Sequence, residues 1–282
     1  MVPFKIDLSG KNVVITGGAG VLCSAFAEAL AECGANIAVL DINKEAAEVV
    51  AKNIRDKGGN AISVEANCLD TDSLEKARAE VVKVFGECDI LINGAGGNNP
   101  KGTTDNEQML PGDIKKEDLK TFFDLDPKGI SFVFDLNILS AVLTTQVFAK
   151  GMVEKEVGNI INVSSMNAFR PLTKIPAYSA AKAGVSNLTQ WMSVHFAPCN
   201  IRVNAIAPGF FVTNQNRNLL FDSDGNPTAR SKKILSNTPM NRFGDPDDLI
   251  GTLLWLVSDK ASGFVTGTVI PVDGGFAAYS GV

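Results

Sequence analysis

Three side chains in the second half of the chain have the types and spacing needed for proton transfer to a carbonyl oxygen. Tyr178 and Lys182 are four residues apart, so on a helix they would share one face, within reach of each other. A tyrosine hydroxyl normally has a pKa of about 10, and a nearby ammonium group would lower that pKa towards working pH. Ser165 follows a predicted strand and could hydrogen-bond the reacting oxygen. A Tyr–Lys pair alone is common on exposed helix faces, so this prediction depends on the rest of the chain.

A glycine-rich turn near the N-terminus predicts a dinucleotide site. It runs from Thr16 to Gly20, after a predicted strand and before a predicted helix. Glycines there let the backbone approach a pyrophosphate, which would lie at the helix N-terminus against free N–H groups. Because the turn has the strand–turn–helix context that the motif requires, phosphate binding is favoured over an ordinary tight turn.

Asp41 indicates which dinucleotide is bound. It closes the second predicted strand, 21 residues beyond Gly20. A carboxylate there can accept hydrogen bonds from both ribose hydroxyls of the adenosine half, and it would repel a 2′-phosphate. No Arg or Lys occurs between Asp41 and Lys44. We therefore expect NAD (NADH) rather than NADP as the cofactor.

Short apolar runs alternate with longer amphipathic stretches along the chain. The runs are almost continuously apolar, as in parallel strands buried on both faces, and the stretches between them have helical spacing. This order predicts an α/β fold with a doubly wound, mostly parallel sheet of the Rossmann type, helices on both faces, and a single domain over residues 1–282. The expected strands are Asn12–Thr16, Asn36–Asp41, Ala61–Asn67, Asp89–Gly94, Asn159–Ser164, Arg202–Ala207 and Thr268–Val272, and the clearest helical stretches are Ser24–Cys33, Lys44–Lys57 and Leu74–Phe85.

Two polar stretches, at about residues 97–129 and 210–243, interrupt this alternation after strand ends. Ligands of open α/β sheets bind there, so we expect binding loops, although a disordered insertion is an alternative for the first. With the residues after Ser165, they supply amides, which suit a polyhydroxylated substrate, and Arg side chains, which suit a carboxylate. This favours a sugar acid over an apolar substrate, although each residue singly could be a solvated loop position. The candidates are Asn98, Asn99, Asn167, Arg170, Asn214, Gln215, Asn216 and Arg217, of which we expect Asn99, Asn167, Arg170 and Arg217 to contact the substrate.

The overall composition narrows the choice of partners. The chain has 282 residues and a formal net charge of −5 without a basic stripe, so a nucleic-acid partner is not expected. Its only histidine is His195, which argues against a histidine-built site, and we expect no metal. Five cysteines without a C-x-x-C pair are typical of reduced thiols in the cytoplasm, and we expect neither a leader nor a membrane span.

Taken together, the motifs resemble those of the short-chain dehydrogenase/reductase family, and the resemblance covers almost the whole chain. It implies that Tyr178 is the general acid/base, that Lys182 lowers its pKa and binds the nicotinamide ribose, and that Ser165 orients the substrate oxygen. It also implies that Asn137 holds a water in the proton relay. The matching pieces are Thr16-Gly17 with Gly20, Asp41, Asn93-Gly94-Ala95-Gly96, Asn137, Ser165, Tyr178 with Lys182, Pro208-Gly209 and Val272-Asp273-Gly274-Gly275.

The cofactor contacts that the resemblance implies come from the ends of several strands. The glycine turn and the following helix start would hold the pyrophosphate, the segment from Asn93 would flank the adenosine, and residues after Pro208 would approach the nicotinamide carboxamide. The full set is Gly17, Gly20, Val21, Leu22, Asp41, Asn67, Cys68, Asn93, Gly94, Ala95, Lys182, Pro208, Phe211 and Thr213.

Two features depart from the family pattern. The loop normally reads T-G-x-x-x-G-x-G, whereas here Val21 and Cys23 replace the last two glycines and Gly20 comes one place early. The path of this loop is therefore in question. Asn67 stands where the family usually has Asp, which removes a charge near the adenine.

Four stretches are similar to the branch of this family that interconverts D-fructuronate and D-mannonate with NAD(H). They are the glycine turn, the insertion after Gly97, the segment Val212–Arg217 and the tail Phe276–Val282. The resemblance implies that reaction and a homotetramer. The alternatives are a reductase of another keto-acid or polyol such as ketogluconate, a 3-oxoacyl thioester reductase and, more distantly, a non-catalytic NAD-binding sensor. A sensor would be expected to lack part of the Ser–Tyr–Lys set.

Overall fold

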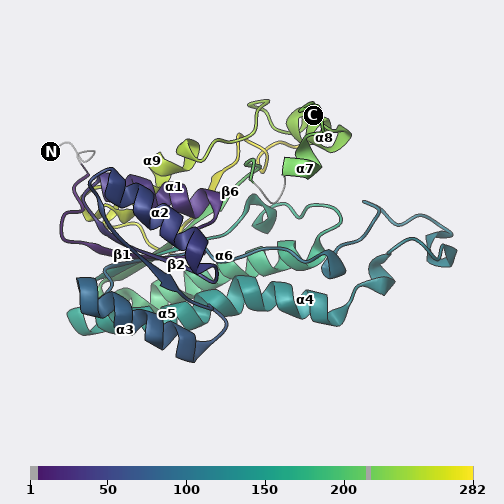
Figure 1. Cartoon of the computed structure of the whole chain (residues 1–282). Coiled ribbons are helices and arrows are strands. Elements are labelled where there is room, and N and C mark those ends of the chain that lie inside the picture. The colour runs from purple at the N-terminus through teal and green to yellow at the C-terminus, as the bar shows by residue number, and fades with distance from the viewer. Residues whose placement is uncertain (1–5, 214–216, 282) are drawn as a thin grey trace.

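The computed structural model describes residues 6–213 and 217–281, which form one sheet of seven parallel strands with helices on both faces (Figure 1). The strand order is β3-β2-β1-β4-β5-β6-β7. This confirms the predicted doubly wound fold, and the strand ends differ from the predicted ones by at most two residues. The strands are β1 (Asn12–Thr16), β2 (Asn36–Asp41), β3 (Asn60–Glu65), β4 (Ile90–Asn93), β5 (Gly158–Val163), β6 (Ile201–Pro208) and β7 (Val269–Val272).

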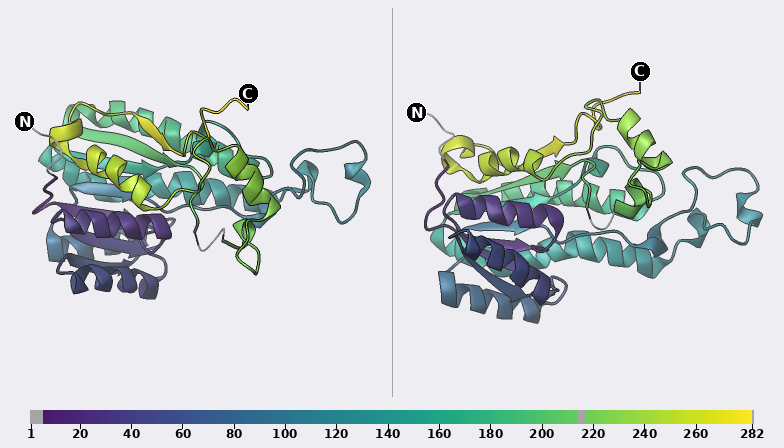
Figure 2. Two further views of the ribbon diagram at one scale, coloured as in Figure 1. Left: turned by 90° about the horizontal axis from the view of Figure 1, so that it is seen from above. Right: turned by 45° about the horizontal axis from the view of Figure 1, so that its top comes forward.

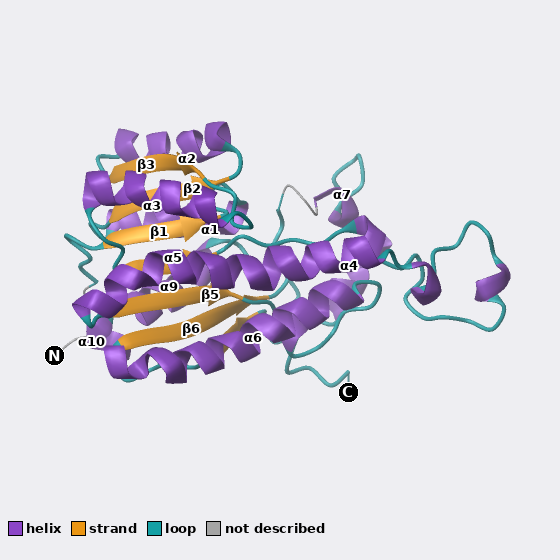
Figure 3. Cartoon of the chain, turned by 90° about the horizontal axis from the view of Figure 1, so that it is seen from below, coloured by secondary structure: helices purple, strands orange, loops and turns teal. Residues whose placement is uncertain are grey.

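Alternation along the strands divides the core into two layers. In β1, Val13 and Ile15 belong to the same buried cluster as Phe26, whereas Val14 belongs to the cluster of Phe148. Successive side chains of a strand point to opposite faces, so a sheet that is apolar on both faces needs a helix layer on each. The first face is covered by α1 (Val21–Glu32), α2 (Lys44–Asp56) and α9 (Asp247–Val257), and the second by α3 (Thr71–Phe85), α5 (Ser140–Lys155) and α6 (Pro176–Phe196) (Figures 1 and 3).

The longest helix on the second face contains a π turn. α4 (Pro127–Phe134) continues through the π turn Asp135–Leu139 into α5, and Asn137 lies in this turn. Single π turns inside helices are frequent at functional sites. By length and composition the combined helix, Pro127–Lys155, could also cross a membrane, but half of its most apolar window is buried in the protein, as in a core helix.

The first long connection projects from the carboxyl end of the sheet as an arm (Figure 2). It spans residues 97–126 and contains three short 3-10 turns. Its base is fixed, because the Thr104 N–H donates to the Lys174 carbonyl oxygen (2.9 Å) and Glu107 pairs with Lys233. The turns are Pro100–Gly102, Asp113–Lys115 and Phe122–Asp124.

The second long connection, residues 210–243, lies at the same end of the sheet (Figure 3). It contains two short helices, and its base is joined to the body by a bridge between Phe211 and Gly244. The strand ends that carry the predicted catalytic residues therefore lie between two long connections. The remaining helices are α7 (Arg217–Leu220) and α8 (Ala229–Ser236) in this connection, and α10 (Asp259–Ser262) after α9.

Candidate active site

Ser165 and Tyr178 meet beyond the carboxyl end of β5. Ser165 is the residue that caps the short 3-10 turn Met166–Ala168. α6 begins with Pro176, a residue favoured in the first turn of a helix, and this start places Tyr178 in that turn. The two hydroxyl groups are hydrogen-bonded to each other. Because each hydroxyl can both donate and accept, a substrate oxygen can be held by the pair.

Lys182 lies one helical turn after Tyr178 and is buried, with 4% of its surface exposed. Its Nζ lies 5.7 Å from the centre of the Tyr178 ring and donates to the Val163 carbonyl oxygen (2.8 Å). The Ser164 hydroxyl donates in turn to the Lys182 carbonyl oxygen (3.1 Å). These bonds fix α6 against the end of β5. The sequence analysis missed Val163 because a backbone acceptor leaves no side-chain signal.

Burial changes the pKa values of this pair in opposite directions. It raises the pKa of Tyr178, and the hydrogen bond with Ser165 only partly opposes the rise. It lowers the pKa of Lys182 to about 8. The expected lowering of the Tyr178 pKa by Lys182 is therefore not found: the ammonium has lost hydration itself, and its hydrogen bond is directed to a carbonyl and not to the phenol.

Gly96 brings Asn137 and Lys182 together. A Cβ on residue 96 would lie 2.7 Å from Asn137 Oδ1 and 3.1 Å from Lys182 Nζ. The Asn137 amide nitrogen donates to the carbonyl oxygens of Gly97 and Val133 (both 2.7 Å), and its oxygen accepts from the Gly97 N–H (3.2 Å). Both amide hydrogens are thus used, so the relay water that we expect at Asn137 would have to be held by its side-chain oxygen or by its backbone.

The glycine-rich turn leaves backbone donors free at the start of α1. Gly17 has a φ of +60°, and a Cβ there would come within 3.0 Å of Ala95, so the position requires glycine. Gly20 precedes α1 and provides no capping side chain, and the first intrahelical bond runs from the Ser24 N–H to the Gly20 carbonyl oxygen. The N–H groups of residues 21–23 precede that bond, and the first turn contains no acidic residue. They fit a pyrophosphate, as expected, although Val21 replaces a glycine.

Cys23, the other departure from the family pattern, is accommodated by Gly94. The side chain is buried against Gly94, whose Cβ, if present, would come within 2.2 Å of the sulfur. Burial raises the pKa of Cys23 to about 12, so the group stays a thiol. The Thr16 hydroxyl accepts from the N–H groups of Gly94 (3.1 Å) and Ala95 (3.3 Å), which holds this turn against the end of β1.

Asp41 ends β2 beside the glycine turn. One carboxylate oxygen accepts from the Ala19 N–H (3.1 Å) and the other from the Asn43 N–H (3.0 Å). A carboxylate has about four acceptor positions, so two remain for ribose hydroxyls. The next residue, Ile42, is an exposed apolar side chain that offers nothing to a 2′-phosphate.

Two of the expected cofactor residues have side chains that point into the core. The Cys68 thiol is hydrogen-bonded to Thr16 and Thr144. The Asn93 amide donates to Asn162 (2.8 Å) and Thr145 (3.1 Å), which joins β4 to β5 and α5. Any contact of Cys68 or Asn93 with a cofactor must therefore use the backbone.

Asn67 differs from these two because it is exposed. Its side chain accepts from the Leu69 N–H (3.0 Å) in the connection after β3. The structure thus places Asn67, but not the side chain of Cys68, on the outer surface of this strand end.

Of the expected nicotinamide contacts, Pro208 ends β6 and is buried. Phe211 is also buried, and its ring covers Gly244, where a Cβ would come within 2.5 Å of it. Thr213 is partly exposed, and its carbonyl oxygen accepts from the Arg217 N–H (2.9 Å). Thr213 is therefore the better candidate for a side-chain contact.

The expected substrate residues do not form one cluster. Asn99 caps the 3-10 turn at the base of the arm, and its side chain accepts from the Lys101 N–H (2.9 Å). The exposed Arg217 guanidinium lies 5.8 Å from the centre of the Phe221 ring. Asn214, Gln215 and Asn216 lie outside the described residues.

Asn167 and Arg170 lie closest in the chain to the catalytic hydroxyls. Asn167 is 4% exposed, its N–H donates to Ser165 Oγ (3.2 Å), and its Oδ1 has no hydrogen-bond partner in the described part of the chain. Arg170 is exposed, and its Nε donates to the Ala277 carbonyl oxygen (2.7 Å). Arg170 therefore ties the C-terminal segment to the segment that follows Ser165.

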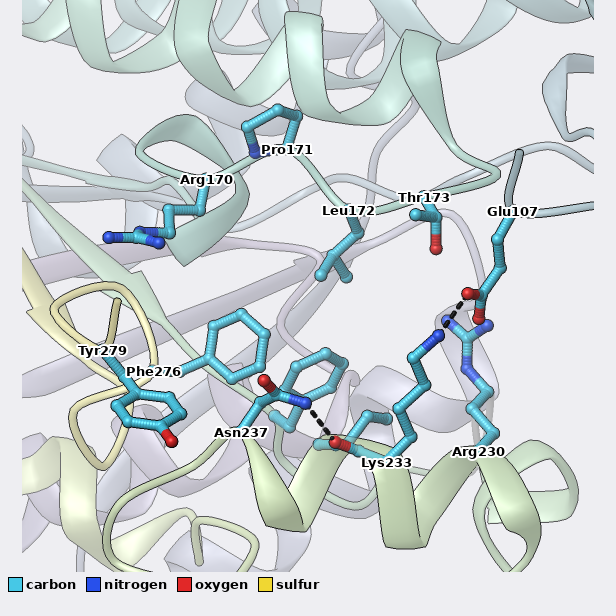
Figure 4. Close-up of a pocket in the computed structure, with 12 residues that line it drawn as sticks. Glu107, Arg170, Pro171, Leu172, Thr173, Arg230, Lys233, Asn237, Phe276 and Tyr279 are labelled. Atoms are coloured by element: carbon cyan, nitrogen blue, oxygen red, sulfur yellow. Dashed lines mark hydrogen bonds and ion pairs between the residues drawn. The ribbon is translucent and has the colours of Figure 1, made fainter. Parts of the chain in front are cut away.

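A cavity of about 260 Å³ opens between these two segments and α8 (Figure 4). Its walls come from residues 170–173, from Phe210 and Phe276, and from charged side chains of α8. Those charged residues, Arg230 and Lys233, were missed by the sequence analysis. Charges on a short amphipathic helix look like solvated surface until a cavity is seen beside them.

The arrangement has the parts for reducing a ketone except the hydride donor. The hydroxyl pair can hold and protonate a carbonyl oxygen, and the helix start with Asp41 can bind a dinucleotide, which carries hydride. Fold and site together define a dinucleotide-dependent oxidoreductase. A family model described as "Enoyl-(Acyl carrier protein) reductase" matches residues 18–277. The chain belongs to the short-chain dehydrogenase/reductase family of oxidoreductases.

Several similar proteins bear names of sugar-acid enzymes. A crystal structure with bound NAD, of a Haemophilus influenzae protein provisionally named D-mannonate oxidoreductase, is 58% identical with a TM-score of 0.93 and covers 98% of each chain. An uncharacterized oxidoreductase of Bacillus subtilis is 52% identical over 282 residues, 100% of both chains. The 5-keto-D-gluconate 5-reductase of Escherichia coli is 32% identical over 269 residues, 95% of this chain and 96% of its own. The family is therefore certain, whereas the substrate names differ among relatives.

Proposed function

We propose that the protein is an NAD(H)-dependent reductase of a sugar-acid ketone, with D-fructuronate and D-mannonate as its substrate pair. The observation that carries this proposal is the cavity beside the segment that joins Ser165 to Tyr178, because its lining includes the cations Arg170, Arg230 and Lys233 among apolar side chains. The cations favour a substrate that has a carboxylate. The name of the NAD-bound relative at 58% identity supports the same substrate pair.

The residues of this chain would bind and orient both reactants. The N–H groups at the start of α1 would hold the pyrophosphate, Asp41 the adenosine ribose and Lys182 the nicotinamide ribose. When bound, the nicotinamide supplies the hydride. Ser165 would donate a hydrogen bond to the carbonyl oxygen, and Tyr178 would transfer its hydroxyl proton to that oxygen. The raised pKa of Tyr178 keeps this proton in place at neutral pH, which suits the reduction direction.

The test is the loss of NADH absorbance with purified protein and D-fructuronate, compared with D-tagaturonate, 5-keto-D-gluconate and an acetoacetyl thioester. Fast turnover of D-fructuronate that is lost in Tyr178→Phe is the expected result. Turnover of the thioester alone would contradict the sugar-acid proposal.

The second candidate substrate is 5-keto-D-gluconate. It is favoured by the 32% identity with a 5-keto-D-gluconate 5-reductase over nearly the whole chain. A carboxylate at the far end of a six-carbon ketone is common to both candidates, so the cavity accommodates either. Faster turnover of 5-keto-D-gluconate than of D-fructuronate would make 5-keto-D-gluconate the preferred candidate substrate.

We also propose that the protein is a homotetramer that works in the cytoplasm. Trp191 and Val194 on α6 are 59% and 76% exposed, and large exposed apolar side chains on one helix favour a subunit interface. The free thiols of the cysteines are stable in a reducing compartment. Light scattering on a sizing column would test the assembly, and Trp191→Glu should weaken it.

A further inference from the structure

We propose that Arg230 binds the substrate carboxylate and thereby makes the enzyme selective for sugar acids over neutral sugars. This inference rests on the proposed function, because it requires a substrate with a carboxylate. It adds a specificity-determining residue on α8, which the family resemblance does not assign.

The cavity that Arg230 lines is connected to the catalytic hydroxyls by a short piece of chain. After Ser165 the chain turns back at once, since the Arg170 N–H donates to the Met166 carbonyl oxygen (3.1 Å). Residues 170–173 then form one wall of the cavity and lead to Tyr178. α8 forms the facing wall, as Figure 4 shows. The proposal places the remaining carbons of a ketone held at Ser165 and Tyr178 along this wall.

Arg230 has a free guanidinium in a partly buried position. The carboxylate near it, that of Glu107, forms its ion pair with Lys233, and Arg230 acts on Glu107 only through longer-range attraction. A partly buried cation that has no bonded partner gains more from a ligand carboxylate than a fully hydrated cation does. The planar guanidinium can bind both oxygens of a carboxylate through two parallel hydrogen bonds.

The other cations of the cavity are already in use. Lys233 pairs with Glu107 at the base of the arm, and Arg170 is bonded to the Ala277 carbonyl oxygen. Lys233, Lys174 and Arg230 together lower the pKa of Glu107. Three cations thus surround one protein carboxylate, and the excess positive charge favours a second carboxylate. Of the three, Arg230 is the one that both lines the cavity and has no bonded partner in the described chain.

The test compares an acid with its neutral counterpart in the same variant. D-Fructose has a hydroxymethyl group where D-fructuronate has the carboxylate. In Arg230→Gln, kcat/KM for D-fructuronate should fall about 10- to 100-fold, mainly through KM, as expected for the loss of a charged hydrogen-bonded contact. For D-fructose it should change less than about 3-fold. Arg230→Lys should recover part of the loss, because it keeps the charge without the paired geometry.

Lys232→Gln is the matched control. It removes the same charge from the same helix, but Lys232 is exposed and does not line the cavity. Its kcat/KM for the acid should stay near that of the wild type. A second readout avoids slow turnover of a neutral sugar: binding of D-mannonate to the NADH complex should weaken in Arg230→Gln, while binding of D-mannitol should not.

Two results would overturn the inference. Equal losses on the acid and the neutral sugar would show that Arg230 is structural, and an unchanged KM for the acid would show that the carboxylate binds elsewhere. Failure of the proposed substrate pair can be distinguished from failure of the Arg230 inference, because in that case the wild type itself would not reduce D-fructuronate. The comparison then uses 5-keto-D-gluconate against its neutral counterpart L-sorbose. A wild type that reduces neither acid overturns both proposals.

Discussion

The sulfur of Cys23 lies against the α-carbon of Gly94, so close that a β-carbon on residue 94 would come within 2.2 Å of it. Residue 23 is where the family pattern puts a glycine, in the helix after the first strand. Here the side chain is on the helix and the glycine is on the turn after β4. Helix α1 and the turn after β4 can still approach each other closely, because the glycine is now on the turn and not on the helix.

Gly94→Ala should therefore destabilise the protein. The new methyl group would meet Cys23 Sγ and also the Thr16 carbonyl oxygen, at 2.7 Å. Overpacking of this kind typically costs about 1–3 kcal/mol, to be measured as the free energy of unfolding in urea. Gly251→Ala in α9 is the control, since nothing lies within 4 Å of its Cβ position, and it should be neutral or stabilising. Cys23→Ala should recover part of the loss in Gly94→Ala. Equal effects of both glycine substitutions would show that the contact is not tight in solution.

Tyr178→Phe should remove the proton donor without removing the cofactor site. We expect kcat to fall at least about 100-fold, while the dissociation constant of NADH, measured by fluorescence titration, changes little. Asp41 and the α1 start are unchanged in this variant. Equal turnover of variant and wild type would contradict the assignment and favour an NAD-binding sensor instead.

Lys182 should contribute a part of the free energy of unfolding that rises with pH above neutrality, measured as the difference between wild type and Lys182→Met. Burial lowers its pKa to about 8 in the native state, from 10.5 in its ordinary state. Between these two values the unfolded chain binds more protons than the native one, so increasing pH stabilises the native state. From about pH 7.5 to about pH 9.5 this contribution is on the order of 2 kcal/mol.

Lys182→Met should abolish that rise, whereas Lys76→Met, at an exposed position, should keep it. The comparison of the two profiles is needed because burial raises the pKa values of Cys23, Cys68 and Cys88, and also that of Tyr178, so that these groups act in the opposite sense in both proteins. Parallel pH profiles for wild type and Lys182→Met would mean that the ammonium is solvated in the native state.

Asp41→Ser with Ile42→Arg should shift the cofactor preference from NADH towards NADPH. The substitution removes the carboxylate that repels a 2′-phosphate and adds a cation at an exposed neighbouring position. The ratio of kcat/KM for the two cofactors is the measurement. Ile42→Arg alone should shift the ratio much less, and an equal shift would show that Asp41 does not determine the preference.

The sequence sufficed for the fold because the strands are buried on both faces. Val13, Val14 and Ile15 are all inaccessible to solvent in β1, and an uninterrupted apolar run is the signal that such a strand leaves. Boundaries were less accurate where the chain keeps the strand direction beyond the paired strand, as at Ala66 and Asn67 after β3, where the Ala66 N–H still donates to the Asp41 carbonyl oxygen (2.9 Å).

The site was less predictable wherever a role depends on backbone groups or on distant segments. The side chain of Asn137 holds residue 97, and nothing local to Asn137 indicates this partner 40 residues earlier. Similarly, Arg230 lines a cavity whose facing wall is formed by residues about sixty positions earlier in the sequence, and nothing near Arg230 in the sequence indicates this cavity. Tyr178 and Lys182 were identified by spacing, but the directions of their pKa shifts depend on burial, which spacing does not specify.

The π turn at residues 135–139 means that the number of residues in this helix determines where the site residue Asn137 lies. A π turn is equivalent to one extra residue in an α-helix, and each residue of an α-helix advances about 100° and 1.5 Å. Deleting a single residue there would leave a continuous, regular helix, yet it would rotate all of α4 relative to α5. Val133 would turn away from Ala177 and Ala181 of α6, with which it forms a small buried cluster, and Asn137 would leave residue 97. A one-residue deletion that changes no catalytic side chain would thus move the base of the arm, residues 97–126, away from the catalytic residues.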